Sequence, residues 1–192
     1  KEHGSLAYSK TPVEVDIGRP VVLITSAEME ECLTHLFAPY GGLQDAAPLV
    51  ARKIQALQRQ QEWEKKARPT QLPPGNYLSQ KQISGPGWQA EVGFQGAPGG
   101  PRVVDILYQN KLLCSETLPS HLPPGSQAVL NLDRATVNFD WTGLEGEEFE
   151  GAMKGLVDHL ESFFHDMEAL SPSQIYPCLR DYLLDCLSGT KR

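Results

Sequence analysis

The chain has 192 residues, a formal net charge of −7, and 40% hydrophobic and 21% charged residues. This length suits one large domain or two small ones, and a domain of this size buries about 70% of its unfolded surface without help from metals or disulfides. The acidic balance argues against nucleic-acid binding, which requires a basic surface. The longest apolar run, Val21–Ile24, is far shorter than the roughly 20 residues that cross a bilayer. We therefore expect neither a nucleic-acid partner nor a membrane span.

The cysteine pattern favours a reduced protein. Cys32, Cys114, Cys178 and Cys186 form no Cys-x-x-Cys pair, and each falls within an apolar pattern, where a thiol behaves as a small hydrophobe. No asparagine begins an Asn-x-Ser/Thr acceptor site. We expect a cytoplasmic or nuclear protein that needs no cofactor or metal.

The N-terminal part predicts a strand–strand–helix–helix (ββαα) unit. Residues 1–11 are expected to form a flexible leader, and residues 12–68 the unit itself. The alternation of Val13–Ile17, and the apolar run that follows it, predict two short strands. Thr25, three residues before Glu28, is a capping-box signal for the first helix.

The second helix is expected to begin near Asp45, and its apolar stripe fails after Leu57. The polar segment that follows is basic and rich in glutamine, with one large apolar side chain. Because tryptophan and arginine are enriched at binding hot spots, this helix end is a candidate surface for a partner protein with an acidic surface. The alternative is an exposed helix end that has no function, or one that pairs with this protein's own acidic residues at 145–150. The candidate partner-binding residues are Arg59, Trp63, Lys65, Lys66 and Arg68.

Residues 69–141 contain strand and turn patterns separated by glycine- and proline-rich breakers. A tight turn near Asn110 is expected to pair two of the strands. The predicted strands span residues 77–83, 88–94, 102–108, 111–117, 127–132 and 134–140. Their order predicts an antiparallel β-meander.

Residues 142–192 predict two helices, the first over 147–168 with an apolar stripe at three-four spacing and the second after Ser171. Strands and helices occur in blocks, which favours an α+β fold. We predict a single α+β domain over residues 12–192, in which two C-terminal helices pack on a meander of about six strands.

Two groups of side chains could support catalysis. Cys32 and His35, three residues apart on the first helix, could act as a nucleophile and its base. The structural alternative is a buried thiol on the apolar helix face. A second group shares the polar face of the 147–168 helix and could bind a metal or exchange protons, the alternative being a solvated face. It consists of Asp158, Glu161, Ser162 and His165.

No sequence motif specifies a reaction. We therefore predict a non-enzymatic protein–protein interaction module, acting as an adaptor or as a subunit of a larger intracellular complex. The alternative is a small enzyme, or an inactive enzyme-like domain, that uses Cys32 and His35 or the carboxylate–histidine group of the 147–168 helix.

Overall fold

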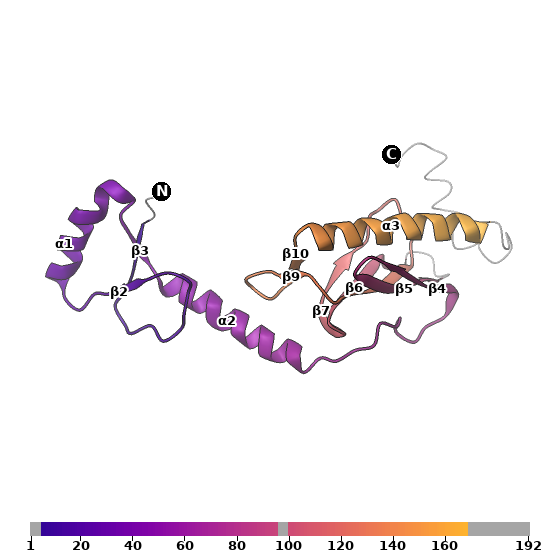
Figure 1. Ribbon diagram of the computed structural model, residues 1–192, viewed down its shortest axis with the longest axis horizontal. Helices are drawn as coiled ribbons and strands as arrows, with labels where there is room; N and C mark the ends of the chain where they lie inside the picture. The colour runs from indigo at the N-terminus through magenta and orange to yellow at the C-terminus, as the bar shows by residue number, and fades with distance from the viewer. Residues whose placement is uncertain (1–4, 96–99, 169–192) are drawn as a thin grey trace. The chain divides into compact units, whose positions relative to one another are not determined.

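The computed structural model describes residues 5–95 and 100–168 (Figure 1). These residues form two compact units, Lys1–Gln60 and Gln61–Arg192, which are described separately. Because two compact units can still unfold together, the single domain predicted for residues 12–192 stays a prediction. The mixed α and β content is confirmed, with three α-helices and a five-stranded sheet among the described residues.

The Lys1–Gln60 unit contains a three-stranded parallel sheet. Strand β1 (Leu6–Ser9) lies between β2 (Val21–Leu23) and β3 (Leu43–Asp45). The prediction of a flexible leader over residues 1–11 is therefore wrong for β1, in which Ala7 and Ser9 are buried. The predicted ββαα order is also incomplete, because β3 stands between the two helices. Strands of three or four residues are too short to show the periodicity on which the prediction depends.

The first helix, α1 (Ala27–Phe37), begins one residue later than its capping signal suggested. Its N-cap is Ser26, whose hydroxyl accepts a hydrogen bond from the backbone N–H of Met29 at 3.2 Å. A 3₁₀ turn, η1 (Ala38–Tyr40), follows the helix. Residues 13–17 form no strand and belong to the loop between β1 and β2.

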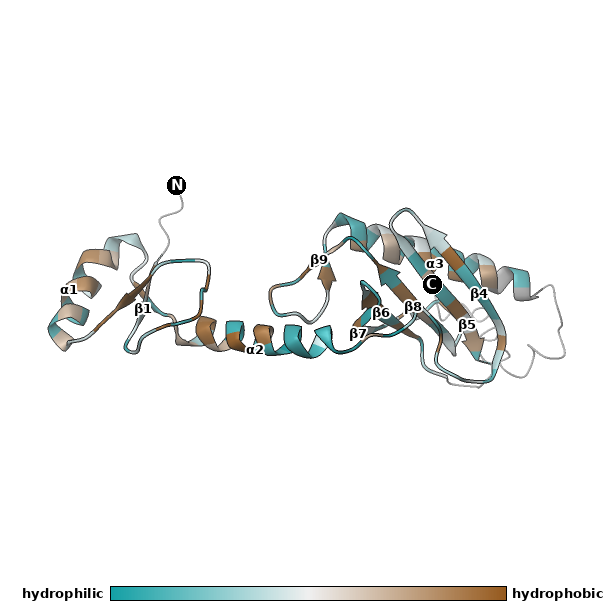
Figure 2. Ribbon diagram, turned by 60° about the horizontal axis from the view of Figure 1, so that its bottom comes forward, coloured by the Kyte–Doolittle hydropathy of each residue, from teal (hydrophilic) through white to brown (hydrophobic). Residues whose placement is uncertain are grey.

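The second helix, α2 (Ala47–Glu64), begins where it was predicted. The Asp45 carboxylate accepts a hydrogen bond from the backbone N–H of Ala47 at 2.9 Å, and Pro48 lies in the first turn, where its missing N–H has no cost. The hydropathy colours of Figure 2 change along α2 from brown to teal. The apolar stripe therefore ends within the helix, as the sequence indicated.

The Gln61–Arg192 unit is built on a five-stranded sheet in the order β4-β5-β8-β6-β7. Its strands are β4 (Tyr77–Gly85), β5 (Trp88–Gln95), β6 (Val103–Tyr108), β7 (Lys111–Thr117) and β8 (Ser126–Leu132). The strand positions were predicted to within about two residues, but the meander is wrong. Strand β8 is inserted between β5, to which it is antiparallel, and β6, to which it is parallel.

The predicted sixth strand, residues 134–140, is reduced to β9 (Thr136–Val137), which pairs with β10 (Leu144–Glu145) outside the main sheet. All seven residues of β8 are buried. A strand in the centre of a sheet pairs its backbone groups on both sides and buries more apolar area than an edge strand does. This explains why the buried strand β8 lies in the centre of the sheet.

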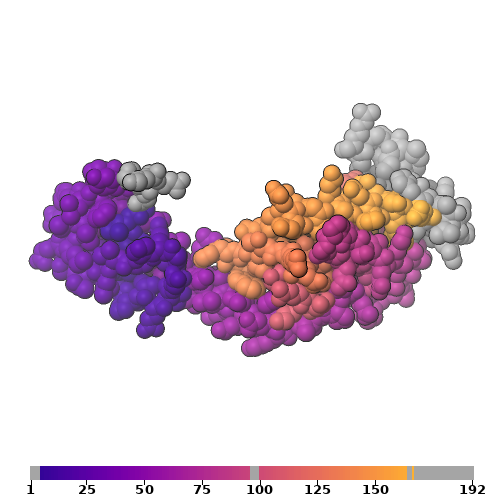
Figure 3. Space-filling view, in the orientation of Figure 1, coloured from indigo at the N-terminus to yellow at the C-terminus, as the bar shows by residue number. Residues whose placement is uncertain are grey.

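Helix α3 (Glu147–Glu168) covers one face of this sheet. The predicted apolar stripe is confirmed at Leu156, Leu160 and Phe163, which are buried in the main core with side chains of β5, β6 and β8. In the space-filling view of Figure 3, the orange-to-yellow atoms of α3 lie directly against the magenta atoms of the sheet. The second predicted C-terminal helix lies outside the described residues.

The opposite face of the sheet carries a smaller cluster made by Leu72, Leu107 and Val129. The chain before β4 crosses this face, where the backbone N–H of Leu72 donates to the Glu91 carboxylate at 2.6 Å. A Cβ atom at Gly93 would lie 2.5 Å from Leu72 Cδ1. The absence of a side chain at Gly93 therefore lets Leu72 pack on the sheet.

Candidate functional site

Trp63, predicted to be an exposed anchor for a partner, is packed within the Gln61–Arg192 unit. Its side chain is only 8% exposed, and its ring lies 5.6 Å from that of Tyr108 and 5.1 Å from that of Trp141. Its indole N–H donates to the backbone carbonyl of Lys111 at 3.3 Å, and the Lys111 ammonium lies 4.4 Å from the ring centroid. The interpretation of Trp63 as an exposed anchor is therefore wrong. Its aromatic partners come from segments far away in the sequence, which no local pattern reveals.

Arg68 is also used inside the unit. Its guanidinium lies 2.6 Å from the Asp105 carboxylate, whose other oxygen accepts a hydrogen bond from Ser115. Arg68 N–H donates to the carbonyl of Asn110, and Lys66 C=O accepts from the N–H of Leu112. These contacts hold the segment after α2 against the beginning of the edge strand β7.

The remaining candidates of this helix end, Arg59, Lys65 and Lys66, have exposed side chains. Their role in partner binding stays a prediction. Because Trp63 and Arg68 make contacts inside their own unit, the basic helix end loses its apolar anchor and one of its cations as groups for a partner.

The structure does not bring Cys32 and His35 into contact, and both are exposed on α1. The alternative interpretation of Cys32 as a buried thiol is therefore wrong. No residue of α1 is buried in its unit, so the apolar spacing of this helix does not correspond to a core face.

The polar face of α3 is confirmed as exposed at Asp158, Glu161 and Ser162. Glu161 pairs with His121 at 2.9 Å, on side chains that are each about half exposed. The side chain of the fourth candidate, His165, lies outside the described part. Within that part, no three His, Cys, Asp or Glu side chains are grouped so that they could hold a metal ion.

Cys114 differs from Cys32 in its surroundings. Burial, with smaller contributions from the carboxylates of Glu116 and Asp105, raises the pKa of the Cys114 thiol to about 11. At pH 8 such a thiol is roughly 0.1% ionised, and only the thiolate reacts with alkylating agents. We expect iodoacetamide at pH 8 to label the exposed Cys32 at least about tenfold faster than Cys114. Residue-resolved mass spectrometry over a time course measures the two rates, and equal rates would contradict the burial of Cys114.

The two edge strands of the five-stranded sheet differ in how far the described residues cover them. At the β7 edge, Ala67 forms an antiparallel bridge with Lys111, so the segment after α2 covers the beginning of that edge. At the β4 edge, the backbone of Tyr77–Gly85 pairs with β5 on one side, and no other described residue forms a backbone hydrogen bond with it. In an edge strand, alternate residues direct their N–H and C=O groups away from the neighbouring strand. Within the described part of the chain, strand β4 therefore presents a row of backbone groups without a partner.

Most side chains of β4 are polar and uncharged, although Leu78 is an exposed apolar residue of the strand. Ile83 packs against the main core, which places Ser79 and Lys81 on the α3 side of the sheet as well. Gln80, Gln82 and Ser84 lie on the opposite side. Lys81 is the only charged residue of the strand, in a chain whose net charge is −7.

A polar pocket of about 270 Å³ adjoins the β4 edge. It is lined by Gln82, Ile83 and Ser84 of β4, by Gln89 and Ala90 of β5, and by Thr70 from the segment that crosses the sheet. The amide and hydroxyl groups of this pocket both donate and accept hydrogen bonds. The pocket can therefore receive a polar side chain from a segment that runs along β4.

The sequence patterns located strand β4 but did not show that its outer edge is open among the described residues. The predicted meander also places β4 at an edge, yet it does not show which edge the rest of the chain covers. That difference follows from the bridge between Ala67 and Lys111, two residues that no local pattern connects.

Among the described residues, no helix combines the length and the apolar character that a membrane span requires. A comparison with models of protein families finds none that matches the chain, and a comparison with curated proteins finds no significant match.

Proposed function

We propose that this protein is a non-enzymatic interaction module, an adaptor or a subunit of a larger complex, which binds an extended segment of another protein along β4. The observation that carries this proposal is the open edge of Tyr77–Gly85 among the described residues. An extended peptide that joins a sheet edge gains main-chain hydrogen bonds, each contributing about 0.5–1.5 kcal/mol. Side-chain pockets beside the edge then provide specificity.

The chemistry of the β4 edge favours a neutral or acidic segment. The strand has no carboxylate and one cation, Lys81. A partner carboxylate across from Lys81 would form a favourable cross-strand pair, whereas a second copy of β4 would bring a like charge to the edge. The register shift between Tyr77 and Ser79 also interrupts regular pairing at one end. Both features disfavour self-association and leave Ser79–Gly85 as the regular part of the edge.

The proposed location is the cytoplasm or the nucleus. It is supported by the free thiols of Cys32 and Cys114, which are both unpaired in the described part of the chain.

The test combines photo-cross-linking with proline substitution. A photoreactive amino acid at the exposed position Gln80 should cross-link one extended segment of a partner in a cell extract, and the same group at Asp158 on α3 should not. Lys81→Pro and Gln82→Pro are a matched pair, because neighbouring residues alternate between an inward and an outward N–H. In one of the two variants, proline replaces a residue whose N–H donates to β5, so a backbone hydrogen bond of the sheet is lost and the melting temperature falls. The other removes only an outward N–H, and we expect it to reduce cross-linking at least about tenfold while the melting temperature stays nearly unchanged.

Undiminished cross-linking in the variant with the unchanged melting temperature would contradict strand addition. Reversing Arg59, Lys65 and Lys66 to glutamate, in a separate variant, tests the remaining basic residues of α2. If that variant loses the partner and the proline variant keeps it, the helix end is the interface and the β4 edge is not.

A further inference from the structure

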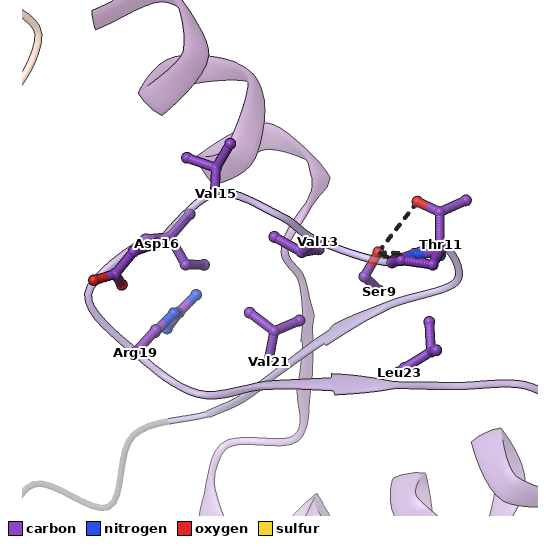
Figure 4. A pocket seen from close by; sticks show the side chains of 10 residues that line it. Ser9, Thr11, Val13, Val15, Asp16, Arg19, Val21 and Leu23 are labelled. Atoms are coloured by element: carbon purple, nitrogen blue, oxygen red, sulfur yellow. Dashed lines mark hydrogen bonds between the residues drawn. The ribbon is translucent and has the colours of Figure 1, made fainter. Parts of the chain in front are cut away.

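The loop between β1 and β2 encloses a cavity within the Lys1–Gln60 unit (Figure 4). Its volume is about 340 Å³, at the lower end of the roughly 300–1,000 Å³ of small-molecule sites. Six of its ten lining residues are aliphatic, polar atoms form about half of its exposed wall, and it is open to solvent on one side. The aliphatic lining residues are Pro12, Val13, Val15, Ile17, Val21 and Leu23.

One cationic side chain, that of Arg19, enters this cavity. Figure 4 shows the Arg19 side chain directed into the space that the loop surrounds, while the Asp16 carboxylate lies at the rim. The Arg19 Nη2 donates to Gln44 Oε1 at 2.9 Å, and Gln44 Oε1 also accepts from the Ser5 hydroxyl. The Asp16 carboxylate accepts from the backbone N–H of Gly18 at 2.8 Å, and it forms no ion pair with Arg19 in the described chain.

The Arg19 Nε is buried and has no hydrogen-bond partner among the described residues. A guanidinium carries five N–H donors, and leaving a buried donor unpaired destabilises the folded state. Because solvent does not reach Nε in this conformation, a carboxylate would bond it only after a rotation of the Arg19 side chain, and it would then form a charge-assisted hydrogen bond in a partly enclosed site.

We infer that this cavity binds a short aliphatic carboxylate, with the carboxylate on Arg19 and the alkyl chain against Val13, Val15 and Val21. Two sources share this chemistry: a free short-chain acid, and the terminal carboxylate of a peptide that ends in an aliphatic residue. A polyanion fits poorly, because Arg19 is the only cation among the described residues that line the cavity and Asp16 repels further negative charge. The site lies entirely between Ser9 and Leu23, apart from the β4 edge, so it does not depend on the proposed function.

The test is methyl-resolved NMR of the full chain during titration with butyrate. We expect saturable shifts of the Val13, Val15 and Val21 methyl groups. Butyramide, which has the same shape without the charge, should bind at least tenfold more weakly. Arg19→Met should reduce butyrate affinity at least tenfold, and Arg19→Lys should retain part of it, because lysine keeps the charge but not the planar donor geometry.

Lys10→Met is the matched control. It removes one positive charge from the same unit at an exposed ion pair with Glu30, outside the cavity lining, and it should leave butyrate affinity unchanged. A second titration compares a tripeptide ending in valine with its C-terminal amide. Tighter binding of the free-acid tripeptide than of butyrate would identify a peptide terminus as the source.

The inference is overturned if neither butyrate nor the tripeptide produces saturable methyl shifts. It is equally overturned if butyramide binds as well as butyrate, or if Lys10→Met weakens binding as much as Arg19→Met does. Should Arg19→Met fail to fold, the comparison of butyrate with butyramide on the unaltered chain still decides between these outcomes.

Discussion

Replacing Trp63 by alanine should lower the free energy of unfolding of the Gln61–Arg192 unit by about 3–5 kcal/mol, the range for removing a buried tryptophan. Trp63 is 8% exposed and packs against Tyr108 and Trp141. The substitution removes both ring contacts and leaves a cavity that the surrounding backbone cannot fill. Urea denaturation followed by far-UV circular dichroism measures the loss.

Two variants serve as controls for this result. Trp63→Phe keeps an aromatic ring but loses the indole hydrogen bond to Lys111, so it should cost less than the alanine variant. Lys65→Ala, two residues further along the chain and exposed, should change stability by less than about 0.5 kcal/mol. If Trp63→Ala were as stable as the unaltered chain, Trp63 would be a surface residue after all, and the predicted partner anchor would be restored.

The second large effect is expected at the contact between α3 and the sheet. Leu160 is 3% exposed and belongs to the main core. Leu160→Ala should lower the free energy of unfolding by about 2–5 kcal/mol, as truncations of buried leucines do. The measurement is the shift of the urea midpoint at constant slope, which separates lost stability from a change in the exposed area on unfolding.

Ser162→Ala provides the matched control, because Ser162 lies on the exposed side of the same helix two residues away. It should leave the urea midpoint nearly unchanged. A Leu160→Ala variant with an unchanged midpoint would show that the apolar stripe of α3 does not form a core contact with the sheet.

Local patterns predicted the positions of the strands of the five-stranded sheet and the apolar face of α3. The turn between β6 and β7 is a clear case, since Gln109 and Asn110 adopt the positive φ angles of 51° and 59° that a two-residue hairpin requires. Such turns depend on neighbouring residues alone. Pattern analysis therefore succeeds wherever the interacting residues are close together in the sequence.

The order of the strands depends on contacts between distant residues, and here the prediction failed. Strand β8 carries two polar residues, Gln127 and Asn131, and both side chains are buried. Gln127 accepts a hydrogen bond from the Tyr77 hydroxyl at 2.8 Å, and Asn131 accepts one from the backbone N–H of Asn110 at 2.8 Å. Buried amides with partners from other segments of the chain are compatible with a central position, but a single strand does not reveal those partners.

The interpretation of Trp63 as an exposed anchor failed for a related reason. Composition identifies Trp63 as a large apolar group in a polar helix end, but it does not distinguish a partner in another protein from Tyr108 and Trp141 in the same chain. Conversely, the composition of β4 does not single it out, and the role proposed for it follows only from its place at the sheet edge.

The insertion of β8 also determines the order in which this unit can fold. The β4–β5 and β6–β7 hairpins can form from local sequence, but an isolated hairpin is only marginally stable in water. They cannot join into one sheet until Ser126–Leu132 has been synthesised and has entered between them. During translation, the edges of β5 and β6 that will later pair with β8 therefore stay unpaired until β8 has been made. Unpaired strand edges of this kind are prone to aggregation. Substitutions that weaken β8 should consequently slow folding, and those confined to β7 should mainly speed unfolding.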